Sequence, residues 1–106
     1  MHVYHYLTPR GVDVFQEWLD ELSDLKGRVA VLRRVDRLAR GVIGDYKFIA
    51  AGVWELRIDC GPGYRVYFGR QGKELVLLLC GGSKRTQAAD IEEALRYWKD
   101  YRGRMS

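Results

Sequence analysis

The sequence has no apolar run that approaches the roughly 20 residues needed for a membrane-spanning helix, so it indicates no membrane partner. Its first residues, Met-His-Val-Tyr-His, also lack the charged region and the apolar region that form a secretory signal peptide. These two absences predict a cytoplasmic protein.

Cysteine and histidine are scarce, with two of each among 106 residues. Cys60 and Cys80 fall on expected β-strands, where a reducing compartment would leave them as small buried side chains; a disulfide is the alternative. His2 and His5 lie three positions apart in an expected strand and therefore point to opposite faces. No spacing of these residues is typical of a zinc site. We therefore expect neither a metal nor a cofactor.

Basic residues are concentrated in one part of the chain, which has a formal net charge of +4. Residues 11–25 hold five acids and no base, whereas residues 26–47 hold seven bases and two acids. A basic helix suits a polyanion or an acidic partner. The alternative is an ordinary solvated helix face.

Two helices joined by a very short link are expected near the amino terminus. Thr8 and Pro9 predict a helix start, as N-cap and first helical residue. The first apolar stripe at helical spacing consists of Phe15, Trp18, Leu19 and Leu22. The second consists of Leu25, Val29, Leu32, Val35 and Ala39. We expect both stripes to face the core.

Four strands should follow these helices, and the last expected strand, 74–80, is almost continuously apolar. Such a run predicts a strand in the middle of the sheet. A final helix is expected after Thr86, with a frayed tail from Tyr101. The order β-α-α-β-β-β-β-α predicts one α+β domain over residues 1–106. Its antiparallel meander sheet should carry an N-terminal helical hairpin and a C-terminal helix.

The segment 52–68 predicts a β-hairpin with one apolar face. Trp54, Leu56, Ile58, Tyr64, Val66 and Phe68 alternate along its two strands. The opposite face then carries Glu55, Arg57, Asp59, Arg65 and Tyr67. Two guanidinium groups beside a phenol on a rigid sheet favour a phosphate-binding surface.

Three motifs give the chain a resemblance to a known family. They are Gly-Val-Trp-Glu-Leu-Arg-Ile at 52–58, Gly-Pro-Gly-Tyr-Arg-Val-Tyr-Phe at 61–68 and Leu-Leu-Leu-Cys-Gly-Gly-Ser-Lys at 77–84. With Gln87 and Asp90 after them, they resemble the HigB/Gp49-like branch of the RelE/ParE toxin superfamily, whose members are often labelled addiction module killer proteins. The resemblance covers nearly the whole chain and implies a RelE-like fold.

The resemblance implies the toxin of a type II toxin–antitoxin module. Its partner would be a protein antitoxin, usually a helix-turn-helix, HigA-like protein. RelE- and HigB-like members inhibit translation by cutting mRNA on the ribosome without a metal, which would make this chain an endoribonuclease. ParE-like members inhibit DNA gyrase instead, and a third alternative is an inactive antitoxin-binding module.

Position-by-position comparison with the RelE-type site implies three catalytic residues, Arg65, Lys84 and Arg85. We expect Arg65 to hold the phosphate with help from Arg57 and Arg85, and Lys84 to move a proton. The relatives carry a lysine where this chain has Glu55 and a tyrosine where it has Ile91. Glu55 is therefore a rival general base.

The remaining expected contacts are with RNA. Tyr67 would stack on a base or hold a phosphate, and Arg33, Arg37 and Arg40 would dock on ribosomal RNA. Plainer roles are the alternatives: packing for Tyr67, and an ion pair with Glu55 or Asp59 for Arg57.

Overall fold

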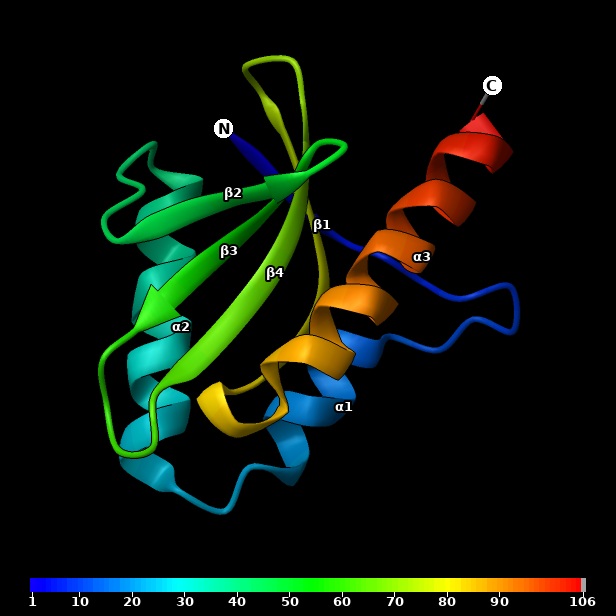
Figure 1. Cartoon of the computed structure of the whole chain (residues 1–106). Helices are drawn as coiled ribbons and strands as arrows, with labels where there is room; N and C mark the ends of the chain where they lie inside the picture. Colours follow the sequence, from blue (N-terminus) through cyan, green and yellow to red (C-terminus); the bar gives the residue numbers. More distant parts are fainter. Residues whose placement is uncertain (106) are drawn as a thin grey trace.

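The computed structural model describes residues 1–105, which form a five-stranded sheet with helices on both faces (Figure 1). The elements are β1 (His2–His5), α1 (Val14–Glu21), α2 (Leu25–Ala39), β2 (Tyr46–Ala50), β3 (Val53–Ile58), β4 (Tyr64–Gln71), β5 (Leu75–Ser83), the 3₁₀ turn η1 (Lys84–Thr86) and α3 (Gln87–Met105). This confirms the α+β class and the expected order of elements. Within these residues, no helix is long and apolar enough to cross a membrane.

The strands are arranged in the order β1-β5-β4-β3-β2. Strands β2 to β5 form the expected antiparallel meander. Strand β1 lies parallel to β5, so the sheet is mixed, and the expectation of a purely antiparallel sheet was wrong. Pairing with both β1 and β4 places β5 inside the sheet, as its continuous apolar run predicted.

Each face of the sheet has its own hydrophobic core. Helices α1 and α2 cover one face, where Phe15 and Val31 pack against Leu56 and Val66. Helix α3 crosses the other face, where Trp98 packs with Tyr67. The hairpin face that the sequence indicated as polar is therefore covered over part of its length.

Helix α1 begins at Val14, so the expected start at Thr8 was wrong. Asp13 is the N-cap, and its Oδ1 accepts a hydrogen bond from the Gln16 amide at 3.0 Å. Thr8 instead closes a turn in which Gly11 has φ of +81°. That left-handed conformation is incompatible with a continuing helix and suits glycine.

Helix α2 buries a different side from the one its apolar stripe indicated. Gly27, Val31 and Leu38 face the sheet, while Leu25 and Leu32 are 70% and 51% exposed. Gly27 determines this orientation because a Cβ there would lie within 2.5 Å of the Tyr64 ring. Periodicity alone cannot show which of two apolar sides packs on a sheet.

Helix α3 continues to Met105, so the tail expected from Tyr101 is helical as far as the structure describes it; Ser106 lies outside the described residues. The buried Tyr6 hydroxyl donates to Asp100 Oδ2 at 2.6 Å. Arg104 donates to the same oxygen and to the Leu7 carbonyl. Burial, with Asp100 beside it, raises the pKa of Tyr6 to about 12. These contacts tie the end of α3 to the amino-terminal strand.

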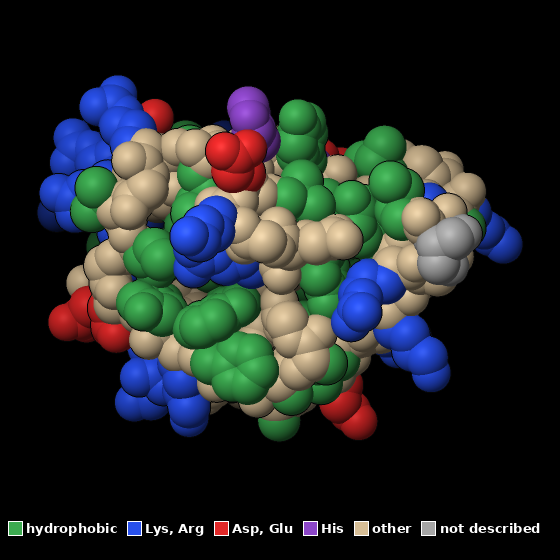
Figure 2. Space-filling model, turned by 90° about the horizontal axis from the view of Figure 1, so that it is seen from above, with side chains coloured by type: hydrophobic (Ala, Val, Ile, Leu, Met, Phe, Trp, Pro, Cys, Tyr) green, Lys and Arg blue, Asp and Glu red, His purple; other side chains and the backbone are tan. Residues whose placement is uncertain are grey.

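The two ends of the sheet differ in surface chemistry. At the end with the β2–β3 and β4–β5 turns, hydrophobic side chains occupy broad areas with Lys and Arg around them (Figure 2). At the opposite end, the β3–β4 turn lies beside η1, the segment that leads into α3 (Figure 1). Arg57, Arg65 and Lys84, which the sequence singled out, lie there.

Candidate phosphate-binding site

Three of the expected site residues meet at the β3–β4 turn. Arg57 and Arg65 are direct register partners on the two strands. Lys84 is the first residue of η1, directly after β5, and its amide donates to the Gly63 carbonyl at 2.7 Å. Together they border a polar depression of about 330 Å³, lined by Asp45, Arg57, Asp59, Gly61, Pro62, Gly63, Arg65 and Lys84. The structure therefore brings together three expected site residues from separate strands and turns, and Arg57 and Lys84 are 27 positions apart in the sequence.

Glu55 lies beneath the two arginines and has no exposed surface. Its Oε1 accepts from Arg57 Nε at 3.0 Å and lies 3.8 Å from Arg65 Nε. Its Oε2 accepts from Gln87 Nε2 at 2.8 Å. Burial alone would raise the pKa of Glu55, but the hydrogen bonds from Arg57 and Gln87 outweigh burial and lower it. Glu55 is therefore a buried anion that orients both arginines.

Arg65 and Arg57 differ in how much of each side chain reaches solvent. The Arg65 side chain is 13% exposed, and that of Arg57 is 34% exposed. Arg65 Nε is buried without a hydrogen-bond partner among the described residues, because Glu55 lies beyond hydrogen-bond distance. Arg65 Nη1 donates to the Tyr64 carbonyl at 3.5 Å, and the side chain lines the depression, so the terminal nitrogens rather than the buried Nε would meet a ligand.

Tyr67 is fully buried in the core under α3, so its ring has no open face on which a base could stack. Its hydroxyl lies among buried groups without a regular hydrogen bond. Burial, followed by the neighbouring Glu55 charge, raises the pKa of Tyr67 far above the ordinary value. The structure thus places Tyr67 behind Glu55, in the packing role that was the alternative to RNA contact.

Two carboxylates, Asp45 and Asp59, also line the depression and are exposed. Asp59 was expected on this face of the hairpin, but Asp45 comes from the loop before β2 and was not anticipated. The depression therefore combines cationic groups with accessible proton acceptors. Glu55, by contrast, is covered and engaged by its partners.

Arg34 supports the depression from behind, and the sequence analysis did not single it out. Its Nη1 donates to the Arg57 carbonyl at 2.5 Å, and its Nη2 donates to the carbonyls of Ile43 and Asp45, each at 3.1 Å. One guanidinium thus ties α2 to β3 and to the loop before β2. A usable signal was its spacing from Val31 and Leu38, which places a charge on the buried side of α2.

Arg85 and Ile91 lie apart from this depression. Arg85 is exposed on η1 and does not line the depression, although its neighbour Lys84 does. Ile91 is partly buried against the α3 core, so the position of the relatives' tyrosine is occupied by a packing residue. Gln87, noted only as part of a motif, holds Glu55.

The three arginines expected to dock on ribosomal RNA lie in two places. Arg33 and Arg37 line a hollow of about 380 Å³ that also includes Asp59, so it adjoins the polar depression. Arg40 lies further along the helix, in an exposed ion pair with Asp36 at 3.3 Å. Arg33 and Arg37 therefore extend the charged surface from the hairpin onto α2.

Among residues 1–105, no three His, Cys, Asp or Glu residues are grouped closely enough to hold a metal ion. Cys60 and Cys80 are free thiols, and burial raises the pKa of Cys80 well above the ordinary value. Both observations agree with the reading of the cysteines as small packing residues.

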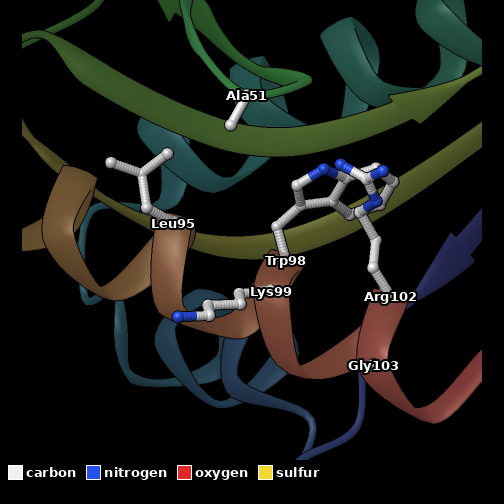
Figure 3. Close-up of a pocket in the computed structure, with 6 residues that line it drawn as sticks. All are labelled: Ala51, Leu95, Trp98, Lys99, Arg102 and Gly103. Atoms are coloured by element: carbon white, nitrogen blue, oxygen red, sulfur yellow. The ribbon is translucent and has the colours of Figure 1, made fainter.

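A second hollow, of about 480 Å³, lies between α3 and the β2–β3 turn (Figure 3). It is lined by Ala51, Leu95, Trp98, Lys99, Arg102 and Gly103. Leu95, Trp98 and Arg102 extend from α3 toward the sheet, whereas Lys99 points away. Its lining has no carboxylate to accept a proton, and Arg102 has no second arginine beside it there. This hollow therefore lacks both features of the polar depression.

The chain belongs to the family of phage-derived Gp49-like proteins (DUF891), whose profile matches residues 17–99. It is also similar to an uncharacterized protein of Haemophilus influenzae (strain ATCC 51907 / DSM 11121 / KW20 / Rd). The two are 48% identical over 80 residues, which cover 76% of this chain and 81% of that protein. Membership in the Gp49-like family suggests a toxin of a toxin–antitoxin system, with an antitoxin as its partner. The matched segment includes the whole polar depression.

Proposed function

We propose that this protein is the toxin of a type II toxin–antitoxin module and cleaves mRNA on the ribosome, in the manner of the RelE and HigB toxins. The observation that carries the proposal is the convergence of Arg57 and Arg65 on the buried carboxylate of Glu55, with Lys84 at the rim of the same depression. Paired guanidinium groups suit the planar, bidentate recognition of phosphate oxygens.

The proposed reaction is an in-line attack by a ribose 2′-oxygen on the adjacent phosphorus. A base removes the 2′ proton, the bond from phosphorus to the 5′-oxygen breaks, and an acid protonates that leaving oxygen. The products are a 2′,3′-cyclic phosphate and a 5′-hydroxyl. Arg65 and Arg57 would stabilise the extra negative charge on the phosphorane, a role that needs no metal.

The positions of the carboxylates suggest how the roles are divided. Glu55 is buried and held by two partners, so we assign it to orienting Arg57 and Arg65 rather than to proton transfer. Asp59 is exposed at the depression and is an accessible base. Lys84 lines the same depression and is exposed, and it would protonate the leaving oxygen.

Docking on the ribosome would use the basic surface that continues from this depression. Arg33 and Arg37 border the adjoining hollow, and Arg40 lies beyond them on α2. Arg85 is exposed on η1 beside Lys84, where it can contact a neighbouring phosphate. Contacts of this kind bind RNA without reading its sequence and weaken as salt rises.

The test compares Arg65→Ala with Arg70→Ala, which removes an arginine from the opposite end of the same strand. Both proteins are first checked for native melting behaviour, then added to a translating extract, and mRNA ends are mapped. We expect Arg65→Ala to lose cleavage by about 10²–10³-fold, as when one transition-state donor is removed. Arg70→Ala should cleave like wild type.

Three outcomes would contradict parts of the proposal: the first concerns the role of Arg65, and the other two concern the nuclease activity itself. Cleavage by Arg65→Ala at the wild-type rate would remove Arg65 from the site. Intact mRNA and normal translation in the presence of wild-type protein, together with inhibition of DNA supercoiling by gyrase, would favour the ParE-like alternative. Intact mRNA with normal supercoiling would favour an inactive antitoxin-binding module.

A further inference from the structure

Helix α2 has a second apolar side that no part of the described chain covers. Leu25, Val29 and Leu32 are 70%, 40% and 51% exposed. Their spacing of four and three residues aligns them along about 10 Å of one helix face. The opposite side of α2, through Gly27 and Val31, packs on the sheet. A helix that is apolar on two sides is typical of one with partners on both.

Basic side chains flank this apolar stripe on both sides. At helical spacing, Arg28 lies on one flank, and Lys26 and Arg33 lie on the other. None of these three forms a salt bridge with another residue of the described range 1–105. Leu25, Lys26, Val29, Ala30 and Arg33 border a shallow hollow of about 390 Å³. The surface therefore combines an apolar stripe with positive charges on both sides of it, and these charges form no salt bridge within the described residues.

From this surface we infer that α2 is the docking site of the antitoxin, which contributes an amphipathic helix with acidic flanks. The spacing of Leu25, Val29 and Leu32 fits the apolar ridge of a second helix packed along α2. The flanking basic residues are electrostatically complementary to carboxylates in the partner. The inference rests on the proposed toxin–antitoxin role but is independent of the nuclease chemistry.

A second copy of this chain fits the surface less well. A twofold dimer brings the same patch against itself, so Lys26, Arg28 and Arg33 would meet their own equivalents. Like charges placed together at an interface are strongly unfavourable. RNA suits the bases but not the three exposed aliphatic side chains, which offer no stacking surface. An acidic helix satisfies both features.

Docking at this surface would also explain how an antitoxin could inhibit the toxin without entering the polar depression. Arg33 borders both the hollow beside the stripe and the hollow that leads to Asp59. A helix seated on Val29 and Leu32 would cover Arg33 and its basic neighbours. Binding of the antitoxin and binding of the ribosome should then exclude each other.

The test measures, by titration calorimetry, binding of one defined probe, the antitoxin that the proposed toxin–antitoxin module would encode beside this gene. The double variant Val29→Glu, Leu32→Glu places carboxylates on the stripe. The carboxylate at position 29 lies four residues before Arg33, and an acid so placed before a base stabilises a helix, so α2 should still form. We expect binding to weaken by about 100-fold. The matched control, Val42→Glu, changes a loop valine that is 57% exposed and should shift affinity by no more than about twofold.

Salt dependence separates the charge argument from the apolar one. Affinity for the probe should fall as salt rises, and the fall should be shallower in Lys26→Gln, Arg33→Gln. Arg65→Ala should bind the probe like wild type, so a failure of the nuclease proposal leaves this result unaffected. Equal affinities at low and high salt would contradict the acidic flanks.

Other results would overturn the docking site. Wild-type affinity in Val29→Glu, Leu32→Glu, or no binding of the probe to wild type, would contradict it. A wild-type dimer in sedimentation that the double variant dissociates would identify a second copy as the occupant. Loss of ribosome binding in the double variant, with probe binding retained, would identify a ribosomal contact instead.

Discussion

The buried carboxylate of Glu55 allows a sharp prediction, because it lies within 4 Å of both arginines of the polar depression. Glu55→Gln keeps the shape of the side chain and removes its charge. The amide oxygen can still accept from Arg57, but the amide nitrogen then faces the Gln87 nitrogen that donated to Glu55. One hydrogen bond to a charged group is lost, and Gln87 must turn its own amide to pair with the new amide nitrogen.

A hydrogen bond to a charged group contributes about 1.5–3 kcal/mol to stability. Because Arg57 is partly solvated, we expect Glu55→Gln to lower the free energy of unfolding by about 2–3 kcal/mol at pH 7. For a domain of this size, that corresponds to a melting temperature lower by roughly 8–20 °C. The control is Glu93→Gln, which breaks an exposed pair with Arg96 at 3.8 Å and should cost no more than about 0.5 kcal/mol.

The pH dependence of this difference tests the charge directly. The folded-state pKa of Glu55 lies below its ordinary value of 4.5. Its contribution to stability is therefore fully present above that value and is lost as pH falls through the folded-state pKa. Wild type and Glu55→Gln, compared by urea unfolding from pH 7 to pH 3, should converge as the solution becomes acidic. Equal stability at pH 7, or a difference that grows in acid, would refute a buried anion at Glu55.

Two other predictions concern packing and the support of the site. Gly81→Ala should lower the free energy of unfolding by about 1–3 kcal/mol, because a Cβ there would overlap the Trp18 ring. The control is Gly103→Ala, where a Cβ meets nothing within 4 Å. In thermal unfolding this control should be neutral or stabilising by up to about 1 kcal/mol. Arg34→Lys should lose most of its three carbonyl hydrogen bonds and cost about 1–3 kcal/mol in urea unfolding. Because Arg34 holds the Arg57 carbonyl, Arg34→Lys should also reduce mRNA cleavage. Unchanged stability together with unchanged cleavage would contradict the supporting role of Arg34.

Much of the fold could be predicted from local signals. The position of β5 inside the sheet followed from its unbroken apolar run. The parallel pairing of β1 could not be predicted, because no local pattern reports which strand lies beside a short amino-terminal segment. The orientation of α2 was missed because the helix has two apolar sides, and the fit of Gly27 against Tyr64 determines which one is buried.

The candidate site was predicted in part. Alternation along the hairpin placed Arg57 and Arg65 on one face, and the motif after β5 brought Lys84 to them. The burial of Glu55 and Tyr67 could not be seen in the hairpin alone, because it results from α3, which begins 16 positions after β4 ends and crosses the same face. That burial changes the interpretation of Glu55 from a base to an orienting anion.

The chemistry of the cut ends tests the central claim most directly. Wild-type protein is added to a reconstituted translation reaction, and the ends of the cleaved mRNA are analysed by enzymatic end-labelling and mass spectrometry. Attack by the 2′-oxygen at the Arg57–Arg65 depression predicts 2′,3′-cyclic phosphates and 5′-hydroxyls that depend on Arg65. Intact mRNA, or fragments with 3′-hydroxyls and 5′-phosphates, would contradict this account.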